Sequence, residues 1–219
     1  MPAAAVTTVL VHSPFLGPAS MRPLADALAA LGHPAVLLDL RPSVVASPVH
    51  QRLIGSFADA MSEAATVGPV VLVGHSGAGP LLPAFASELE DVVRGLVYLD
   101  AGLPTPGQSW RDTVPAEMYR HFTTVSRDGL LPRWQLWFDE DPLPTLAPDD
   151  ALRAEIADET PEVALAFLKE ARPSVEWSGP SGYVALSPAY ARELADATAL
   201  DWPARSLDSH HLATATDPG

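Results

Sequence analysis

The feature that most constrains the fold is an alternation of short apolar runs with amphipathic helical patterns. The runs are rich in β-branched and aliphatic residues and have the length of strands. They are Val6–His12, Ala35–Leu40, Val70–Gly74, Leu96–Asp100, Tyr183–Leu186 and Ala204–Leu207. Because these runs are apolar throughout, they are typical of strands covered on both faces, as in a parallel sheet with helices above and below.

Helical patterns lie between the first of these runs. Met21–Leu31 places leucines on one face and is followed by Gly32, a typical C-terminal stop. Leu53–Ala65 carries a second apolar stripe, and Leu81–Leu89 is a shorter apolar helical segment. Strands and helices in this order predict right-handed crossovers. We therefore expect an α/β fold, a doubly wound and mostly parallel sheet of about six strands with helices on both faces.

The alternation breaks in residues 103–180. This segment is rich in proline, holds four of the five tryptophans and contains no convincing strand. It is too long for an ordinary connection, so we interpret it as a mostly helical lid inserted into a core of residues 1–102 and 181–219. Helices are predicted over Asp149–Ala157 and over Thr160–Lys169, the second with Thr160 as its cap and Pro161 at its first position.

The aromatic residues of this segment have two interpretations. They either line a ligand pocket or form a small core of the lid itself, and buried aromatic residues mostly serve packing. The residues are Trp110, Trp134, Trp137, Phe138 and Trp177.

Composition and charge exclude several classes of protein. The 219 residues suffice for one domain with a sizeable core, and the absence of cysteine removes disulfides, thiolate nucleophiles and cysteine-bound zinc. The net charge of −14 disfavours nucleic acid and anionic membranes as partners. The sequence lacks a run able to span a bilayer, and the N-terminal MPAAAVTTVLVHS lacks the positive region of a secretory signal. We expect a cytoplasmic protein that acts on a small molecule.

One of three Gly-x-Ser sequences stands in a context suited to chemistry. Only Ser76 follows an apolar strand run, precedes an apolar helical segment and has small residues, Gly74 and Ala78, two positions away on either side. A serine that exposes its hydroxyl at the edge of a sheet needs a tight strand-to-helix turn, where larger neighbours do not fit. The dipole of the following helix favours negative charge developing there.

The sequence Gly74-His75-Ser76-Gly77-Ala78 resembles the nucleophile elbow of the α/β-hydrolase superfamily, written G-x-S-x-G, with Ala78 in place of the last glycine. Val97-Tyr98-Leu99-Asp100-Ala101 is most similar to the small esterase and hydroxynitrile-lyase-like branch. The resemblance covers most of the chain. It implies a nucleophile at Ser76 and a base in the loop after the last core strand, often written G-H-x-A and followed by T-x-P.

The C-terminal segment contains two adjacent candidates for that base. The chain reads Ser209-His210-His211-Leu212-Ala213, followed by Thr216-Asp217-Pro218. Alignment with the pattern of the superfamily favours His211, with His210 as the alternative one position earlier. Relatives usually have a closing helix beyond this point, so we expect a homodimer or contacts from the lid to cover the face that such a helix would cover.

The acid that orients the base is missing from its usual place. The segment after the fifth strand run has no carboxylate before Glu193. A variant within the superfamily carries the acid one strand earlier, and Asp100 occupies that position and preserves the order Ser, Asp, His. The alternatives are an aspartate that only caps the strand end, a dyad helped by Ser187 or water, and Asp39, which also ends a strand run.

An acyl-transfer site also needs donors for the oxyanion. The resemblance assigns one to the backbone N–H of Gly77. The second normally comes from the loop after the first strand, which here reads His12-Ser13-Pro14-Phe15, and Pro14 has no N–H at the expected place. Either Phe15 supplies its N–H, or Ser13 supplies its hydroxyl, or the oxyanion hole is weak.

These residues predict a serine hydrolase that cleaves an ester, thioester or lactone of a small hydrophobic substrate through an acyl-enzyme on Ser76, with Asp100 and His211 completing the triad. The alternatives are a lyase or cyclase that uses serine and histidine for proton transfer, and a ligand-binding protein with a vestigial site. No metal or organic cofactor is expected. The candidate pocket residues are Trp110, Trp134, Trp137 and His75, although a histidine at the position of His75 usually packs beneath the elbow.

Overall fold

A six-stranded parallel sheet forms the centre of the computed structural model, which describes residues 6–66 and 68–219. The strand order is β2-β1-β3-β4-β7-β8, and every neighbouring pair is parallel. The strands are β1 (Thr7–Val11), β2 (Ala35–Leu37), β3 (Val70–His75), β4 (Val93–Leu99), β7 (Ser181–Ala185) and β8 (Ala204–Ser206). Each predicted strand run forms a strand of this sheet, and the predicted fold class is confirmed. Residues 1–5 of the N-terminal segment lie outside the described residues.

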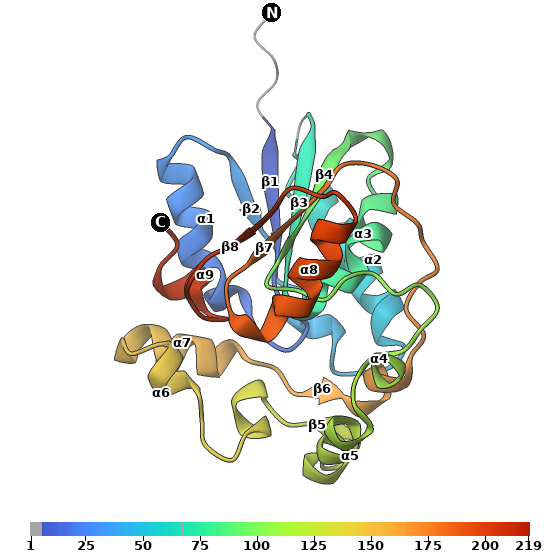
Figure 1. Cartoon of the computed structure of the whole chain (residues 1–219), viewed down its shortest axis with the longest axis vertical. Coiled ribbons are helices and arrows are strands. Elements are labelled where there is room, and N and C mark those ends of the chain that lie inside the picture. The colour runs from blue at the N-terminus through green and yellow to red at the C-terminus, as the bar shows by residue number, and fades with distance from the viewer. Residues whose placement is uncertain (1–5, 67) are drawn as a thin grey trace, which may run out of the picture.

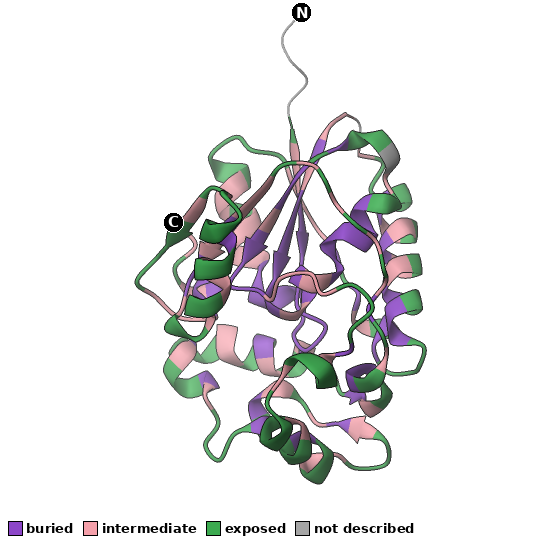
Figure 2. Cartoon of the chain, turned by 45° about the vertical axis from the view of Figure 1, so that its right-hand side comes forward, coloured by how far each residue is buried: buried purple, intermediate pink, exposed green. Residues whose placement is uncertain are grey.

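Helices cover both faces of the sheet (Figures 1 and 2). One face packs its leucines and valines against α1 (Arg22–Ala30) and α9 (Ala213–Thr216). The other packs against α2 (Val49–Glu63), α3 (Leu82–Ser87) and α8 (Ala191–Ala199). Burial on both faces explains why the strand runs are apolar throughout. None of the helices in the described part of the chain is long and apolar enough to cross a membrane.

Residues 103–180 form a layer of short elements between β4 and β7 in the sequence (Figure 1). This insertion lies at the end of the sheet where the strands have their carboxyl termini. Its helices are α4 (Trp110–Thr113), α5 (Ala116–Val125), α6 (Leu143–Leu146) and α7 (Asp150–Glu159). It also holds a small antiparallel pair, β5 (Leu130–Leu131) and β6 (Val163–Ala164), where the sequence showed no convincing strand.

The helix predicted over Thr160–Lys169 does not form. Thr160 instead ends α7, with an extended backbone and its hydroxyl donated to the carbonyl of Ile156. Val163 and Ala164 then pair with β5, and Leu165–Lys169 form a 3₁₀ segment. The Thr-Pro pair resembled a helix start, but pairing with a distant strand outweighed this local signal. The other helix predicted in this region does form, as α7. It begins after Asp149, and the Asp149 side chain caps it by accepting from the Leu152 N–H at 2.8 Å.

The parallel sheet places the ends of strands distant in sequence along one edge. Ser13 follows β1, Ser76 follows β3, Asp100 follows β4, and His211 comes after β8. Ligand sites of open α/β sheets lie outside this edge. The edge and the insertion above it therefore bound the candidate site.

Candidate active site

Ser76 lies on a sharp turn between β3 and the segment that leads into α3. Its backbone φ is 56°, in the left-handed region, which a non-glycine residue rarely adopts. A Cβ at Gly74 would lie 2.9 Å from the Leu82 side chain, and one at Gly79 would lie 2.4 Å from the carbonyl oxygen of Gly102. These close approaches explain the small residues around Ser76. The side chain of Ser76 contributes to the wall of a cavity.

Asp100 is fully buried at the end of β4 and receives four hydrogen bonds. Oδ1 accepts from the backbone N–H groups of Leu186 and Ser187, at 2.8 and 2.9 Å, and Oδ2 accepts from the Ser187 hydroxyl at 2.7 Å. The fourth bond joins Oδ2 to His211 Nδ1 at 2.7 Å. Burial acts to raise the pKa of Asp100, but the bonds from His211 and Ser187 outweigh it and lower the pKa, so the carboxylate is charged.

The residues directly after β7 carry no carboxylate and supply hydrogen-bond donors. At the place where most relatives carry the carboxylate, Leu186 and Ser187 supply donors to the carboxylate of Asp100 instead. Tyr183 in β7 adds support, because its hydroxyl donates to the Ala101 carbonyl at 2.7 Å and accepts from the Ala101 N–H at 3.2 Å. The carboxylate of Asp100, at the end of β4, is thus bound by residues of the segment that follows β7.

The structure separates the two adjacent histidines. His211 contacts Asp100, whereas His210 Nε2 lies 3.2 Å from the Thr216 hydroxyl. Donation from Nδ1–H to Asp100 leaves Nε2 of His211 as the basic nitrogen. The geometry therefore favours His211 over His210 as the residue at the site.

His75 does not line the cavity, contrary to its inclusion among the pocket candidates. It is fully buried beneath His211, with ring centroids 4.6 Å apart, and its Nε2–H donates to the His211 carbonyl at 2.9 Å. Burial and the neighbouring His211 lower the pKa of His75 to about 3. His75 is therefore a neutral support for the loop that carries His211.

The loop after β1 places Ser13 and Phe15 beside Gly77. A Cβ on Gly77 would lie 3.2 Å from Ser13 Oγ and 3.2 Å from the Phe15 ring. The Phe15 N–H donates to Ser13 Oγ at 3.3 Å and is therefore engaged within the loop. The Ser13 hydroxyl accepts this bond and keeps its own proton, which it can donate to an oxyanion. Of the two alternatives for the second donor, this arrangement favours the Ser13 hydroxyl.

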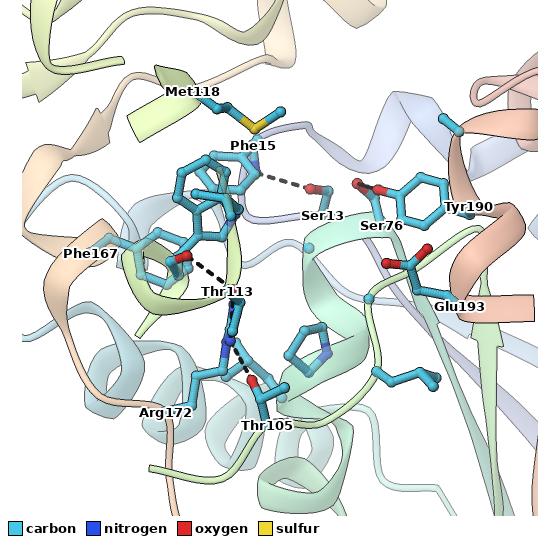
Figure 3. Close-up of a pocket in the computed structure, with 18 of the residues that line it drawn as sticks. Ser13, Phe15, Ser76, Thr105, Thr113, Met118, Phe167, Arg172, Tyr190 and Glu193 are labelled. Carbon is cyan, nitrogen blue, oxygen red and sulfur yellow. Dashed lines mark hydrogen bonds between the residues drawn. The ribbon is translucent and has the colours of Figure 1, made fainter. Parts of the chain in front are cut away.

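A cavity of about 1000 Å³ connects these residues to the insertion (Figure 3). Trp110, Trp134 and Trp137 all contribute to its wall, as does Phe138. Trp137 also packs edge-to-face on Phe15 with ring centroids 4.9 Å apart, so the tryptophans serve both the pocket and the packing of the insertion. Trp177 is absent from the described cavity wall; its indole N–H donates to the Pro180 carbonyl at 3.2 Å.

Tyr190 belongs to the site and was missed by the sequence analysis. Its hydroxyl lies 3.4 Å from Ser76 Oγ (Figure 3). Its ring stacks on His211 with centroids 5.4 Å apart and an interplanar angle of 12°. In the described residues no hydrogen bond joins Ser76 to His211, and the Ser76 hydroxyl contacts the Tyr190 hydroxyl instead. No local motif marks a tyrosine at the start of a helix as a site residue, so only the fold reveals it.

Asp39, the other aspartate that follows a strand, lies partly exposed at the surface. The side chain of Asp39 is 42% exposed and pairs with Arg41 at 2.6 Å, and its Oδ1 lies 3.9 Å from Nε2 of the buried His12. No group of three or more His, Cys, Asp or Glu side chains among residues 6–66 and 68–219 could hold a metal ion.

The strand order, the turn at Ser76 and the polar residues along one sheet edge define an α/β-hydrolase fold. Among solved structures, an extracellular α/β-hydrolase from a Paenibacillus species superposes with a TM-score of 0.75 at 20% identity, over 97% of this chain and 94% of that one. A methylesterase from Arabidopsis has a TM-score of 0.65 at 17% identity, over 97% and 94%. A pyrethroid hydrolase from Sphingobium faniae has a TM-score of 0.65 at 20% identity, over 97% and 92%. By sequence, no protein-family model and no curated protein matches the chain.

Proposed function

We propose that the protein is a serine hydrolase that cleaves the ester of a small hydrophobic substrate. The observation that carries this proposal is the hydrogen bond of 2.7 Å between Asp100 and His211, together with the position of His211 and Ser76 in the wall of the same cavity. The neighbouring folds are named as a methylesterase and a pyrethroid hydrolase, which supports ester hydrolysis. The aromatic wall of the cavity suits an apolar acyl or alcohol group.

In the first half of the reaction, Ser76 Oγ attacks the ester carbonyl while its proton passes to His211 Nε2. Asp100 stays ionised, holds the ring through Nδ1–H and stabilises the imidazolium. The carbonyl oxygen becomes an oxyanion that accepts from the Gly77 N–H and the Ser13 hydroxyl. The tetrahedral intermediate then collapses, the alcohol leaves with the proton from His211, and the acyl group remains on Ser76.

In the second half, water replaces the alcohol. His211 takes a proton from the water, the hydroxide attacks the acyl carbon, and Ser76 leaves with the proton returned by His211. The sum is ester plus water giving acid plus alcohol. Substrate must draw the Ser76 hydroxyl from Tyr190 toward His211, and catalytic hydrogen bonds commonly tighten only when substrate binds.

The first test is covalent labelling with a fluorophosphonate, together with burst kinetics on para-nitrophenyl esters. We expect the wild type to label once and to show a burst, and Ser76→Ala to lose both. Labelling without ester turnover would favour the lyase or cyclase, and a folded protein that does not label would favour a binding protein. Either result would overturn the hydrolase proposal.

The acid is tested by Asp100→Asn with Asp39→Asn as the matched control. The amide carries no charge to stabilise the imidazolium, and its NH2 group can donate to Nδ1 and favour the wrong tautomer of His211, so we expect kcat/KM to fall by about 10³- to 10⁴-fold. Asp39 also follows a strand but is paired at the surface, so its variant should keep the wild-type value. Equal activities of the two variants would remove Asp100 from the mechanism.

A further inference from the structure

Arg172 is a buried cation on the wall of the cavity that holds Ser76. It lies in the insertion, between Leu165–Lys169 and β7, and the residue is only 9% exposed. Its backbone is fixed on both sides, because its N–H donates to the Gln108 carbonyl at 3.0 Å and its carbonyl accepts from the Gly107 N–H at 3.1 Å. The side chain is therefore held at the cavity by a defined backbone.

The guanidinium has only neutral partners. One Nη donates to the Thr105 hydroxyl, and both Nη atoms lie 3.4 Å from the Thr113 hydroxyl (Figure 3). Among the described side chains, no carboxylate lies within 4.0 Å of it, although the arginines at 22, 41, 153 and 192 each have such a partner. A guanidinium carries five N–H donors, so two hydroxyls, one of them distant, leave donors without a strong acceptor.

Among the described residues, no carboxylate forms an ion pair with Arg172 within 4.0 Å, although the charge of Asp112 acts to raise the pKa of Arg172 against the effect of burial. Asp112 is exposed, and its Oδ2 is taken by the Ser109 N–H and hydroxyl at 2.8 and 2.6 Å. Glu170 accepts from the Ser47 hydroxyl and from the N–H groups of Val49 and His50 at the start of α2. Burial lowers the pKa of His50. Burial also lowers the pKa of Arg172, but arginine stays protonated in proteins, so a buried positive charge faces the cavity.

A buried charge without a counter-ion is costly, and a guanidinium binds a carboxylate through two parallel hydrogen bonds. The wall of the same cavity also carries aromatic side chains, among them Phe15, Phe167 and Trp137. A ligand that spans both ends therefore has an ester at Ser76, an apolar body and an anionic group at Arg172.

We propose that Arg172 binds a carboxylate carried by the ester substrate, so that the enzyme acts on hydrophobic monoanionic esters. This inference rests on the proposed hydrolase activity for its ester part, whereas the anion site itself requires only the cavity. The Thr105 hydroxyl, which accepts from Arg172 and keeps its proton, can add a further donor to the bound carboxylate. Arg172 is a specificity residue and takes no part in proton transfer.

The test compares pairs of esters that differ only in a terminal carboxylate or methyl group. One series of para-nitrophenyl esters carries the group at the end of medium-length acyl chains, and a second series carries it on the phenol. We expect the wild type to prefer the carboxylate in at least one series, and Arg172→Met to lower that preference by about 10- to 100-fold. Arg172→Lys should restore part of it. The series that responds identifies the acyl or the alcohol side as the anionic part.

Arg192→Met is the matched control, because Arg192 also borders the cavity but its side chain is 86% exposed and lies 3.8 Å from Asp196. It should keep the wild-type preference. Because Arg172 has no carboxylate partner, Arg172→Met should also melt at or above the wild-type temperature. A preference unchanged in Arg172→Met, or lost equally in Arg192→Met, would overturn the proposal.

A binding measurement separates this inference from the proposed function. Calorimetric titration of Ser76→Ala with the same ester pairs should show tighter binding of the carboxylate member, and the double variant with Arg172→Met should lose the difference. If the wild type cleaves no ester but this difference remains, the hydrolase proposal fails and the anion site stands. If esters are cleaved and the difference is absent, the anion site fails.

Discussion

At the scale of single residues, two strand ends carry backbone strain. Ser76 and Asp100 follow neighbouring strands, and both have left-handed φ values, 56° and 44°. Such conformations cost of order 1–3 kcal/mol and persist only where the surroundings hold them. The hydrogen bonds that Leu186 and Ser187 donate to Asp100, and the narrow space beside Gly74 and Gly79, supply that support. Because β3 and β4 are parallel neighbours, the two strained residues lie at the same edge of the sheet.

The stability of the protein is linked to the protonation of the buried His75. Its pKa is about 3 in the folded protein, lowered by burial and by His211, against about 6.5 when unfolded. Between these values the unfolded chain binds a proton that the folded chain does not. The contribution of His75 is therefore fully present above about pH 6.5 and is lost as pH falls toward about 3.

We expect His75→Asn to reduce the pH dependence of unfolding. In urea titrations from about pH 7 to about pH 4, the slope of the unfolding free energy should fall by up to about 1.4 kcal/mol per pH unit. His12 is also buried with a lowered pKa and has the same sign, so part of the slope should remain. A slope equal to that of the wild type would show that His75 accepts a proton in the folded state.

At the scale of elements, the connection from β3 to α3 packs against the loop after β4. Ser76–Leu81 form a 3₁₀ segment before α3 begins at Leu82, and Pro80 and Pro83 lie within these first turns. A Cβ at Gly79 would meet the Gly102 carbonyl at 2.4 Å and the Ala101 side chain at 2.8 Å. The absence of a side chain at Gly79 therefore allows the turn that carries Ser76 to pack closely against the loop that follows Asp100.

Gly79→Ala should lower both stability and activity. The clash is with backbone, so the segment must shift, and we expect a loss of about 1–3 kcal/mol in the unfolding free energy. The displaced Ser76 should also lower kcat more than KM rises. Gly55→Ala in α2 is the control: nothing lies within 4 Å of its added Cβ, and alanine in a helix should add roughly 0.5–1 kcal/mol. Similar stabilities for the two variants would contradict the close contact at Gly79.

At the scale of the whole molecule, α7 joins the insertion to the core. Glu159 at the end of α7 accepts from the Ala19 N–H at 2.5 Å and from Arg22 Nη2 at 2.7 Å. Its side chain is only 14% exposed, whereas Glu155, which also pairs with Arg22, is 51% exposed. Because Glu159 is more buried than Glu155, it should contribute most of the free energy that holds α7 against the core.

Glu159→Ala should loosen the insertion without unfolding the sheet. Loss of the partner leaves the Ala19 N–H unsatisfied, and we expect amide hydrogen exchange in α6 and α7 to become about 10- to 30-fold faster, with β3 and β4 unchanged. Glu155→Ala should leave the exchange of these helices close to that of the wild type. Equal effects of the two variants would show that the attachment does not depend on Glu159.

The sequence by itself determined the elements of the core and the main candidates for the site. Apolar β-branched runs predicted all of the strands of the main sheet, and the small residues around Ser76 indicated its turn. These signals succeed because strand formation and tight turns depend on residues a few positions apart. The helix predicted at Thr160 was wrong because its residues pair with β5, more than thirty positions away.

Only the tertiary structure decided which side chains meet. The contact of Asp100 with His211, the position of His75 beneath that loop and the place of Tyr190 against Ser76 all join residues more than 100 positions apart. Arg172 has no motif around it and is notable only because its guanidinium is buried without a carboxylate. Strand order and burial create these contacts, and neither is encoded in the spacing of residues along the chain.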